Sequence, residues 1–228
     1  QKTAYEMLRS LVGSEMCIRD RYSPKAERIL RVLLCNPKRA WRIERLAAEA
    51  QVSLGMASKV KRLLEDREWL ARRQEGFNLR EPAKLLAEWA ENYNYGRNTV
   101  EDFYSLDPIP EIESNLANEC RDLRFDYALT GFSAAARLAP MVRYQRATAY
   151  VKGRLDEVAD RMGLKRVSSG ANVALIEPYD DGVLLSVREV GGTRVVSPVQ
   201  TYLDLLNFRG RGEEAAEALL KQVIQPTW

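Results

Sequence analysis

The sequence has no histidine among its 228 residues. Ser-His-Asp and Cys-His catalysis, HExxH metalloenzymes and Cys₂His₂ zinc fingers all require histidine, so this chain cannot carry any of them. Only carboxylate, lysine, tyrosine or backbone groups remain for catalytic chemistry.

Cysteine and long hydrophobic runs are also scarce. Three cysteines, Cys17, Cys35 and Cys120, lie far apart without a CxxC pair, which argues against a zinc ribbon or a thioredoxin-like motif. A sparse, odd number of cysteines suits a reducing compartment, so we expect a cytoplasmic protein. No apolar run approaches the length of a membrane span, and no apolar segment of signal-peptide type is present, so we expect no membrane partner.

Residues 10–21 read SLVGSEMCIRDR and resemble a translated sequencing adapter of the kind used in transposase-based library preparation. We interpret residues 1–21 as adapter-derived or chimeric, which would remove Cys17 from the natural cysteines. The alternative is a natural loop.

Charge is distributed unevenly around a net value of +3. Residues 21–80 hold fifteen Lys or Arg against seven Asp or Glu, a net charge of +8, whereas residues 81–228 sum to −5. A basic block beside an acidic one indicates a polyanion as the partner of the first block. The alternative is a solvated helical surface.

The basic block has the pattern of three helices followed by a hairpin. Apolar positions at helical spacing, bounded by capping residues, predict helices over residues 24–35, 42–50 and 54–66. Two strands joined by a tight turn are expected next, over residues 69–73 and 77–79. This order is that of a winged helix-turn-helix, and LAAEAQVSLGMASKVKRLLEDREWL is similar to bacterial regulators of that fold.

In such a fold the third helix enters the major groove, with its N-terminal half nearest the base edges. Ten positions are the candidates for DNA contact: Arg42, Arg45, Ser53, Gly55, Ser58, Lys59, Lys61, Arg62, Arg72 and Arg73. The first half of the third helix would face bases, and the remaining basic side chains would meet phosphates or the minor groove. Double-stranded DNA is the predicted partner, and a protein-binding winged-helix scaffold is the alternative.

Strands and helices alternate in the second half of the chain, which predicts an α+β protein with a C-terminal mixed α/β domain. We expect a winged-helix domain over residues 22–96, a linker over 97–110 and the second domain over 111–228. Within it, strands are predicted over residues 125–130, 147–151, 173–177, 183–187 and 194–196.

No convincing active site is evident in the second domain. Asp180 and Asp181 are paired carboxylates of a type that holds Mg²⁺, but Asp-Asp-Gly between two strands is typical of a turn. Asp204 is expected to be an exposed polar residue or part of a partner surface. We therefore expect no enzyme, no metal and no cofactor. A nucleotidyltransferase-like enzyme using these carboxylates with Mg²⁺ is the alternative.

Five segments carry a family resemblance over residues 22–228: SPKAERILRVLLCNPKRAW, YALTGFSAAARLAP, ATAYV, SGANVALIEPYDDGV and VVSPVQTYLDLLNFRGRGEEAAEALL. Together with the winged-helix pattern, they resemble the AbiEi-type antitoxins of type IV toxin–antitoxin systems. The resemblance implies a repressor that binds operator repeats, self-associates on them and regulates its own operon. It also implies a C-terminal domain needed for antitoxin action. The functional partner would be a nucleotidyltransferase-like toxin, which is countered without a stable direct complex.

Overall fold

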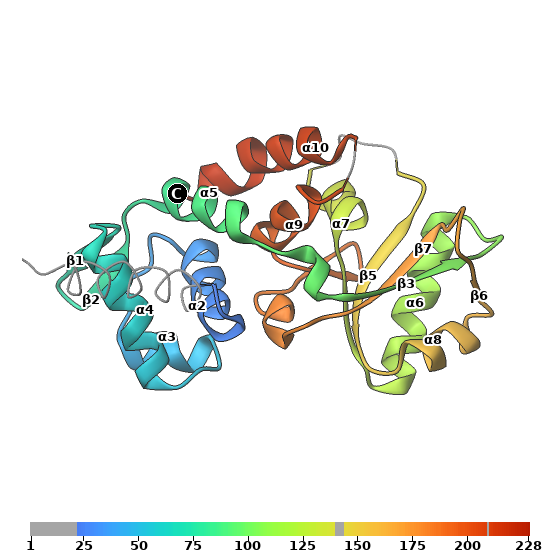
Figure 1. Ribbon diagram of the computed structural model, residues 1–228, viewed down its shortest axis with the longest axis horizontal. Helices are drawn as coiled ribbons and strands as arrows, with labels where there is room; N and C mark the ends of the chain where they lie inside the picture. The colour runs from blue at the N-terminus through green and yellow to red at the C-terminus, as the bar shows by residue number, and fades with distance from the viewer. Residues whose placement is uncertain (1–21, 140–143, 209) are drawn as a thin grey trace, which may run out of the picture. The chain divides into compact units, whose positions relative to one another are not determined.

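The computed structural model describes residues 22–139, 144–208 and 210–228, so the predictions for residues 1–21 and Cys17 lie outside the described residues. The chain divides into two compact units between Tyr93 and Asn94 (Figure 1). Helices and strands are mixed in both units, and the fold is α+β as predicted. No helix in the described part of the chain is long and apolar enough to cross a membrane.

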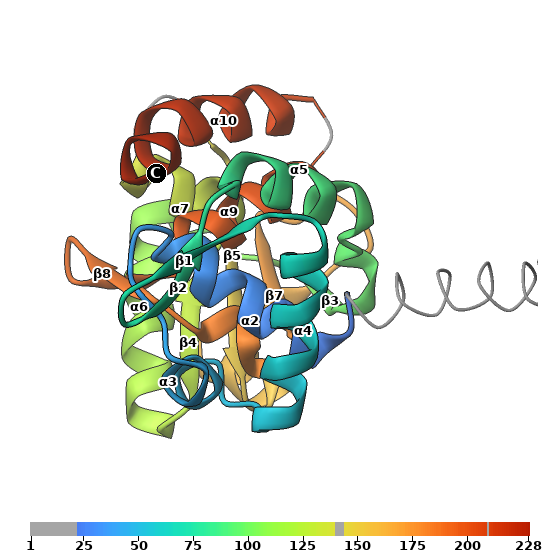
Figure 2. The same cartoon turned by 90° about the vertical axis from the view of Figure 1, so that its left-hand side faces the viewer.

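The N-terminal unit contains the predicted helices and hairpin, followed by one more helix (Figure 2). Its elements are α2 (Pro24–Cys35), α3 (Ile43–Glu49), α4 (Leu54–Asp66), β1 (Leu70–Arg73), β2 (Gly76–Leu79) and α5 (Pro82–Asn92).

Local capping explains where α3 ends and α4 begins. Gln51 adopts a left-handed conformation with φ of 54°. The amide of Gln51 donates to the Ala48 carbonyl at 3.1 Å, and that of Val52 donates to the Ala47 carbonyl at 3.0 Å. This is a Schellman motif with glutamine in place of the usual glycine. The Ser53 hydroxyl then accepts from the Met56 amide at 3.2 Å and caps α4.

The hairpin is fixed to the helices through Trp41, which is fully buried. The Trp41 amide donates to the Phe77 carbonyl at 2.7 Å, and the Phe77 amide donates back at 3.1 Å. Gly76 has φ of +136°, and a Cβ there would lie 2.1 Å from the Trp41 carbonyl oxygen. Glycine is therefore required where the hairpin passes the start of α3.

The C-terminal unit is built on a mixed sheet with the strand order β6-β3-β7-β5-β4-β9-β8 among the described residues. The strands are β3 (Thr99–Tyr104), β4 (Asp126–Leu129), β5 (Ala147–Lys152), β6 (Lys165–Arg166), β7 (Val173–Glu177), β8 (Arg188–Val190) and β9 (Thr193–Val195). The β5–β7 and β4–β9 pairs are parallel, and the other pairs are antiparallel.

Helices surround this sheet (Figure 1). They are η1 (Tyr95–Arg97), α6 (Ile109–Leu123), α7 (Gly131–Leu138), α8 (Leu155–Arg161), η2 (Asp181–Leu184), α9 (Pro198–Leu205), α10 (Gly212–Leu219), η3 (Leu220–Ile224) and η4 (Gln225–Thr227). Helices α6 and α8 pack against the sheet and each other, while α7, α9 and α10 pack together. Strands β4 and β9, which are parallel, lead directly into α7 and α9.

Residues 97–110, expected to be a linker, instead contain strand β3 within the sheet. Glu101 on this strand pairs with Arg166 at 2.7 Å, and Asp102 pairs with Arg146. These basic partners lie far along the chain, so the acidic sequence TVEDFY did not indicate a strand.

The strand expected over residues 183–187 is also wrong, because η2 takes its first two residues and the other three form no strand. The Asp180 side chain accepts from the Gly182 amide at 2.8 Å and starts this helical turn. The strand predicted over residues 173–177 is confirmed as β7, and the one over 194–196 lies one residue earlier as β9.

Candidate nucleic-acid interface

Helix α4 turns one face to the core and the opposite face to solvent. Ala57, Val60 and Leu64 are at most 1% exposed. Five residues on the other side are exposed and share one helical face, which we call the α4 outer face: Leu54, Gly55, Ser58, Lys59 and Arg62. Four of them were predicted DNA contacts, and the structure brings these four together.

Leu54 is the residue on this face that sequence reasoning missed. It is a large apolar side chain at the first position of α4, and it is 49% exposed. Its position directly after the Ser53 cap was the feature of the sequence that could have indicated this exposure. Next to it, a Cβ on Gly55 would meet no atom of the described residues within 4 Å, so they leave room there for a partner.

Arg62 and Lys61 are adjacent in sequence but differ in their surroundings. Arg62 is exposed, and the described residues offer it no ion pair. The Lys61 ammonium instead pairs with Glu65 at 2.6 Å and lies 5.3 Å from the centre of the Phe77 ring. Lys61 therefore points toward the hairpin and is not on the α4 outer face.

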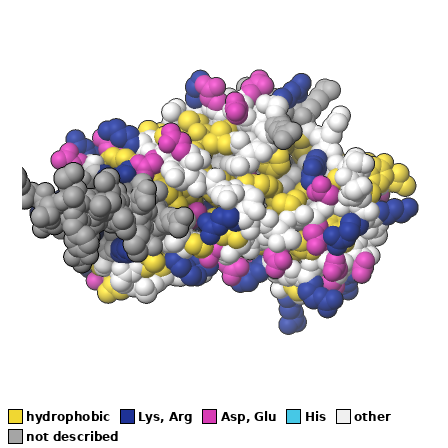
Figure 3. Space-filling view, viewed as in Figure 1, with side chains coloured by type: hydrophobic (Ala, Val, Ile, Leu, Met, Phe, Trp, Pro, Cys, Tyr) yellow, Lys and Arg dark blue, Asp and Glu magenta, His cyan; other side chains and the backbone are white. Residues whose placement is uncertain are grey.

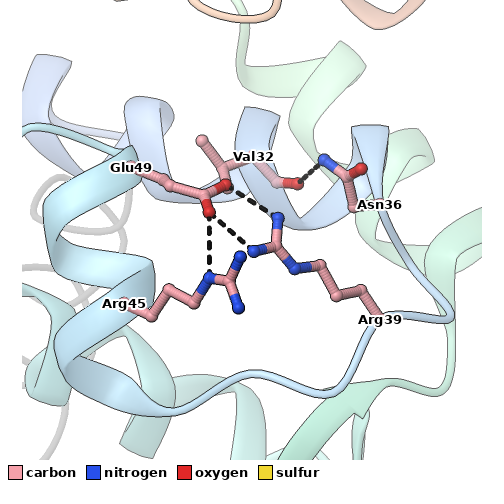
Figure 4. A network of polar contacts seen from close by, with 5 residues as sticks. All are labelled: Val32, Asn36, Arg39, Arg45 and Glu49. Atoms are coloured by element: carbon pink, nitrogen blue, oxygen red, sulfur yellow. Dashed lines mark hydrogen bonds and ion pairs between the residues drawn. The ribbon is translucent and has the colours of Figure 1, made fainter.

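Arg45 on α3 is held by Glu49 (Figure 4). Its Nε donates to Glu49 at 3.3 Å, while two nitrogens of Arg39 contact the same carboxylate at 2.9 and 2.7 Å. The Arg39 guanidinium also lies 4.2 Å above the Trp41 ring. At the end of α2, the Asn36 amide donates to the Val32 carbonyl at 3.3 Å. Glu49 thus holds two guanidinium groups, that of Arg45 on α3 and that of Arg39 in the segment before it.

The hairpin arginines lie beside the start of α3. Arg42, Lys61, Arg72 and Arg73 line one depression of about 390 Å³, bordered also by acidic residues of α3 and α4. Arg73 donates from Nε to the Asn78 side chain at 2.9 Å. Arg42 and Arg72 are exposed, and their side chains form no hydrogen bond or ion pair with the described residues. The ten candidates thus divide between the α4 outer face, this depression, the Ser53 cap and Arg45.

The carboxylates considered for metal binding are engaged separately in the C-terminal unit. Asp180 caps η2, and Asp181 pairs with Lys152 at 2.8 Å. Asp204, expected to be exposed, is fully buried. It accepts hydrogen bonds from Thr130, Tyr150 and Gln200, the last two at 3.0 and 2.9 Å. Among the described residues, no cluster of histidine, cysteine and acidic side chains is arranged to hold a metal ion.

The local pattern around Asp204 gave no indication of this burial. Its donors Thr130 and Tyr150 come from β4–α7 and β5, more than fifty residues earlier. Buried carboxylates are retained where several donors satisfy them. Asp204 therefore joins α9 to the sheet and is not an exposed residue.

Comparison with known proteins gives one family. The family model described as transcriptional regulator, AbiEi antitoxin, type IV TA system matches residues 78–225. No curated protein and no solved structure matches the chain. The matched residues are more than half of the chain and run from β2 to η4. The chain therefore belongs to the AbiEi antitoxin family, the transcriptional regulators of type IV toxin–antitoxin systems.

Proposed function

We propose that this regulator is a repressor whose N-terminal unit is a winged helix-turn-helix that binds double-stranded operator DNA. The observation that carries the proposal is the α4 outer face, where small, apolar and basic side chains share one exposed surface. Helix α3, the turn at Gln51 and α4 would form the helix-turn-helix, and β1–β2 the wing. Small side chains near the start of α4 let its backbone approach base edges.

The roles of the basic residues follow from their contacts. Lys59 and Arg62 on the α4 outer face would meet the DNA in or beside the major groove. Arg42 and Arg72, which line one depression, would bind phosphates beside the groove, because neither forms an ion pair within the described chain. Lys61, Arg45 and Arg73 already have protein partners, so each must exchange one to reach the DNA.

Salt dependence of binding tests this arrangement in the full chain. Each phosphate contact that is lost should lower the slope of log K against log salt by about one. Replacing both Lys59 and Arg62 by alanine should weaken operator binding and reduce the slope by up to about two. Fluorescence anisotropy with a labelled operator at several salt concentrations measures both quantities.

A matched control is Lys84→Ala with Lys221→Ala, which removes two positive charges on α5 and η3. These lysines are 62% and 64% exposed and form surface ion pairs, so their loss should leave affinity and slope near the parent values. An unchanged affinity in the Lys59 and Arg62 variant would show that α4 is not the recognition helix.

The wider role that we propose is autoregulation of the operon and antitoxin action through the C-terminal unit. The family match over this unit supports it. The functional partner would be a nucleotidyltransferase-like toxin, countered without a stable complex, and copies of the repressor would associate on operator repeats. Co-expression with such a toxin tests the antitoxin role: growth should be restored without co-purification of the two proteins. Continued growth arrest would contradict the proposal.

A further inference from the structure

The C-terminal unit contains a cavity of about 770 Å³ that plays no part in the proposed DNA interface. It lies where β4 leads into α7 and where β5 and β7 begin. Its lining includes Phe132, Tyr144, Arg146, Thr148, Phe208 and Arg211. Its volume is within the range of small-molecule sites.

Aromatic rings form one wall of this cavity. The rings of Phe132 and Phe208 are 5.6 Å apart, and Phe208 also lies 5.7 Å from Tyr95. Gly131 has φ of +55°, and a Cβ there would come within 2.8 Å of the Phe208 ring. Because only glycine fits this position, Phe208 can pack directly over the start of α7. The wall is suited to stacking against a flat heteroaromatic ring.

Two arginines supply positive charge to the same cavity. Arg211 is exposed, and the described residues provide its side chain with no ion pair or hydrogen bond. Arg146 pairs with Asp102 through Nη2, which fixes its guanidinium. Its Nε is buried and finds no acceptor in the described part of the chain. A buried N–H without an acceptor is costly, so an acceptor from a ligand would be favoured there.

Two other polar residues of the lining already have partners. Asn172 binds the Ser105 backbone amide and carbonyl at 2.9 and 2.8 Å. The Tyr144 hydroxyl donates to Glu113, which also pairs with Arg137 at 2.8 Å. These residues shape the wall, and the two arginines are the positively charged donors of the lining.

We propose that this cavity binds a nucleoside phosphate. Its base would lie against Phe132 and Phe208, and its phosphate would take hydrogen bonds from Arg146 and Arg211. Guanidinium groups bind phosphate oxygens by strong charge-assisted hydrogen bonds. The volume has room for base, sugar and phosphate together, whereas an inorganic anion would leave the aromatic wall unused.

Calorimetric titration of the full chain with AMP, GMP, CMP and UMP tests the proposal. At least one nucleotide should bind with Kd of about 1 mM or tighter. The matching nucleoside and inorganic phosphate should each bind at least about tenfold more weakly. Absence of binding by all four nucleotides, or phosphate binding as tightly as the nucleotides, would overturn the proposal.

Variants locate the site. Arg211→Ala should weaken nucleotide binding at least about tenfold, because it removes an exposed phosphate donor. Arg188→Ala, which removes an exposed arginine of β8 outside the cavity, should have no effect. Ala171→Trp should obstruct the cavity and weaken binding while the circular dichroism spectrum stays that of the parent. If that variant fails to fold, the effect of Arg211→Ala on nucleotide binding is the test of the site, and unchanged binding would contradict the proposal.

A last control separates the cavity from the proposed DNA interface. The variant with both Lys59 and Arg62 replaced by alanine should bind the nucleotide as the parent does. If this variant loses nucleotide binding while Arg211→Ala keeps it, the nucleotide binds at α4 and the cavity proposal is wrong.

Discussion

Gln51 adopts a left-handed backbone conformation between α3 and α4, where glycine is the usual residue. This conformation is unfavourable for residues with a Cβ. Gln51→Gly should therefore raise the free energy of unfolding, because it relieves this strain. Glycine also adds entropy to the unfolded chain, which offsets part of the gain and leaves about 0.5–1 kcal/mol. Urea unfolding measures the change.

Gln51→Ala is the matched control for this prediction. It removes the side chain, whose oxygen accepts from Arg28 at 3.4 Å, but keeps the Cβ and its strain. Alanine should give no gain in stability. A glycine variant less stable than the alanine variant would show that backbone strain at Gln51 is unimportant.

Glu49 limits the basic surface of α3 and of the segment before it, because it holds both Arg45 and Arg39. Glu49→Gln should weaken these pairs and release the guanidinium groups for phosphate. Operator affinity should rise, and the salt slope should steepen by about one. Glu91→Gln, the same change on α5, should alter neither. Weaker binding by Glu49→Gln would mean that the network is needed to position α3.

Cys120 is a buried thiol of α6 with an alkaline pKa. Burial, together with the nearby Glu119 carboxylate, raises the pKa of Cys120 from its ordinary value near 9 to about 12. The unfolded chain therefore loses this proton first as the pH rises. Between pH 9 and pH 12, Cys120 should lower the free energy of unfolding by up to about 1.4 kcal/mol per pH unit.

The comparison of the parent with Cys120→Ala isolates this contribution. The alanine variant should be less stable at neutral pH because of the cavity it leaves, but its stability should fall less steeply above pH 9. The free energy of unfolding is measured by urea titration at several alkaline pH values. If it falls equally steeply with pH in the two proteins, the raised pKa of Cys120 is contradicted. At neutral pH the Cys120 thiol should resist alkylation until the protein is unfolded.

At the scale of elements, α4 was predictable because its determinants are local. Ser53 caps it, and Ala57, Val60 and Leu64 recur at helical spacing. The direction of Lys61 was not predictable, because its ammonium group lies near the ring of Phe77 in the hairpin and not on the α4 outer face. Strand β3 and the burial of Asp204 depend on partners from distant segments, and no local pattern records those pairings.

The start of α4 also leads to a prediction about which operator bases the protein recognises. Leu54 is exposed at the first helical position, and apolar side chains in the major groove contact the methyl group of thymine. Replacing single thymines of the operator by uracil should weaken parent binding at one position by about 1 kcal/mol or less. Leu54→Ala should bind more weakly and lose that sensitivity. If Leu54→Ala keeps the parent response at every position, Leu54 does not read a methyl group.

At the scale of the whole molecule, the two units differ in charge. Residues 22–93 hold fifteen Lys or Arg against ten Asp or Glu, whereas residues 94–228 hold sixteen against nineteen. Basic and acidic side chains are intermixed on the visible face of the C-terminal unit (Figure 3). The net charge of +3 therefore understates the attraction of the N-terminal unit for a polyanion.

Matched triple variants of the full chain test whether local or total charge governs DNA binding. Replacing Arg42, Arg72 and Arg73 by alanine removes three charges from the hairpin depression and should lower the salt slope by about three. The control replaces three exposed residues of the C-terminal unit, Arg154, Lys165 and Arg188. Both variants have the same net charge, so equal losses of slope would show that long-range attraction dominates. A loss confined to the first variant would place the phosphate contacts on the hairpin and the start of α3, because direct contacts release counterions locally.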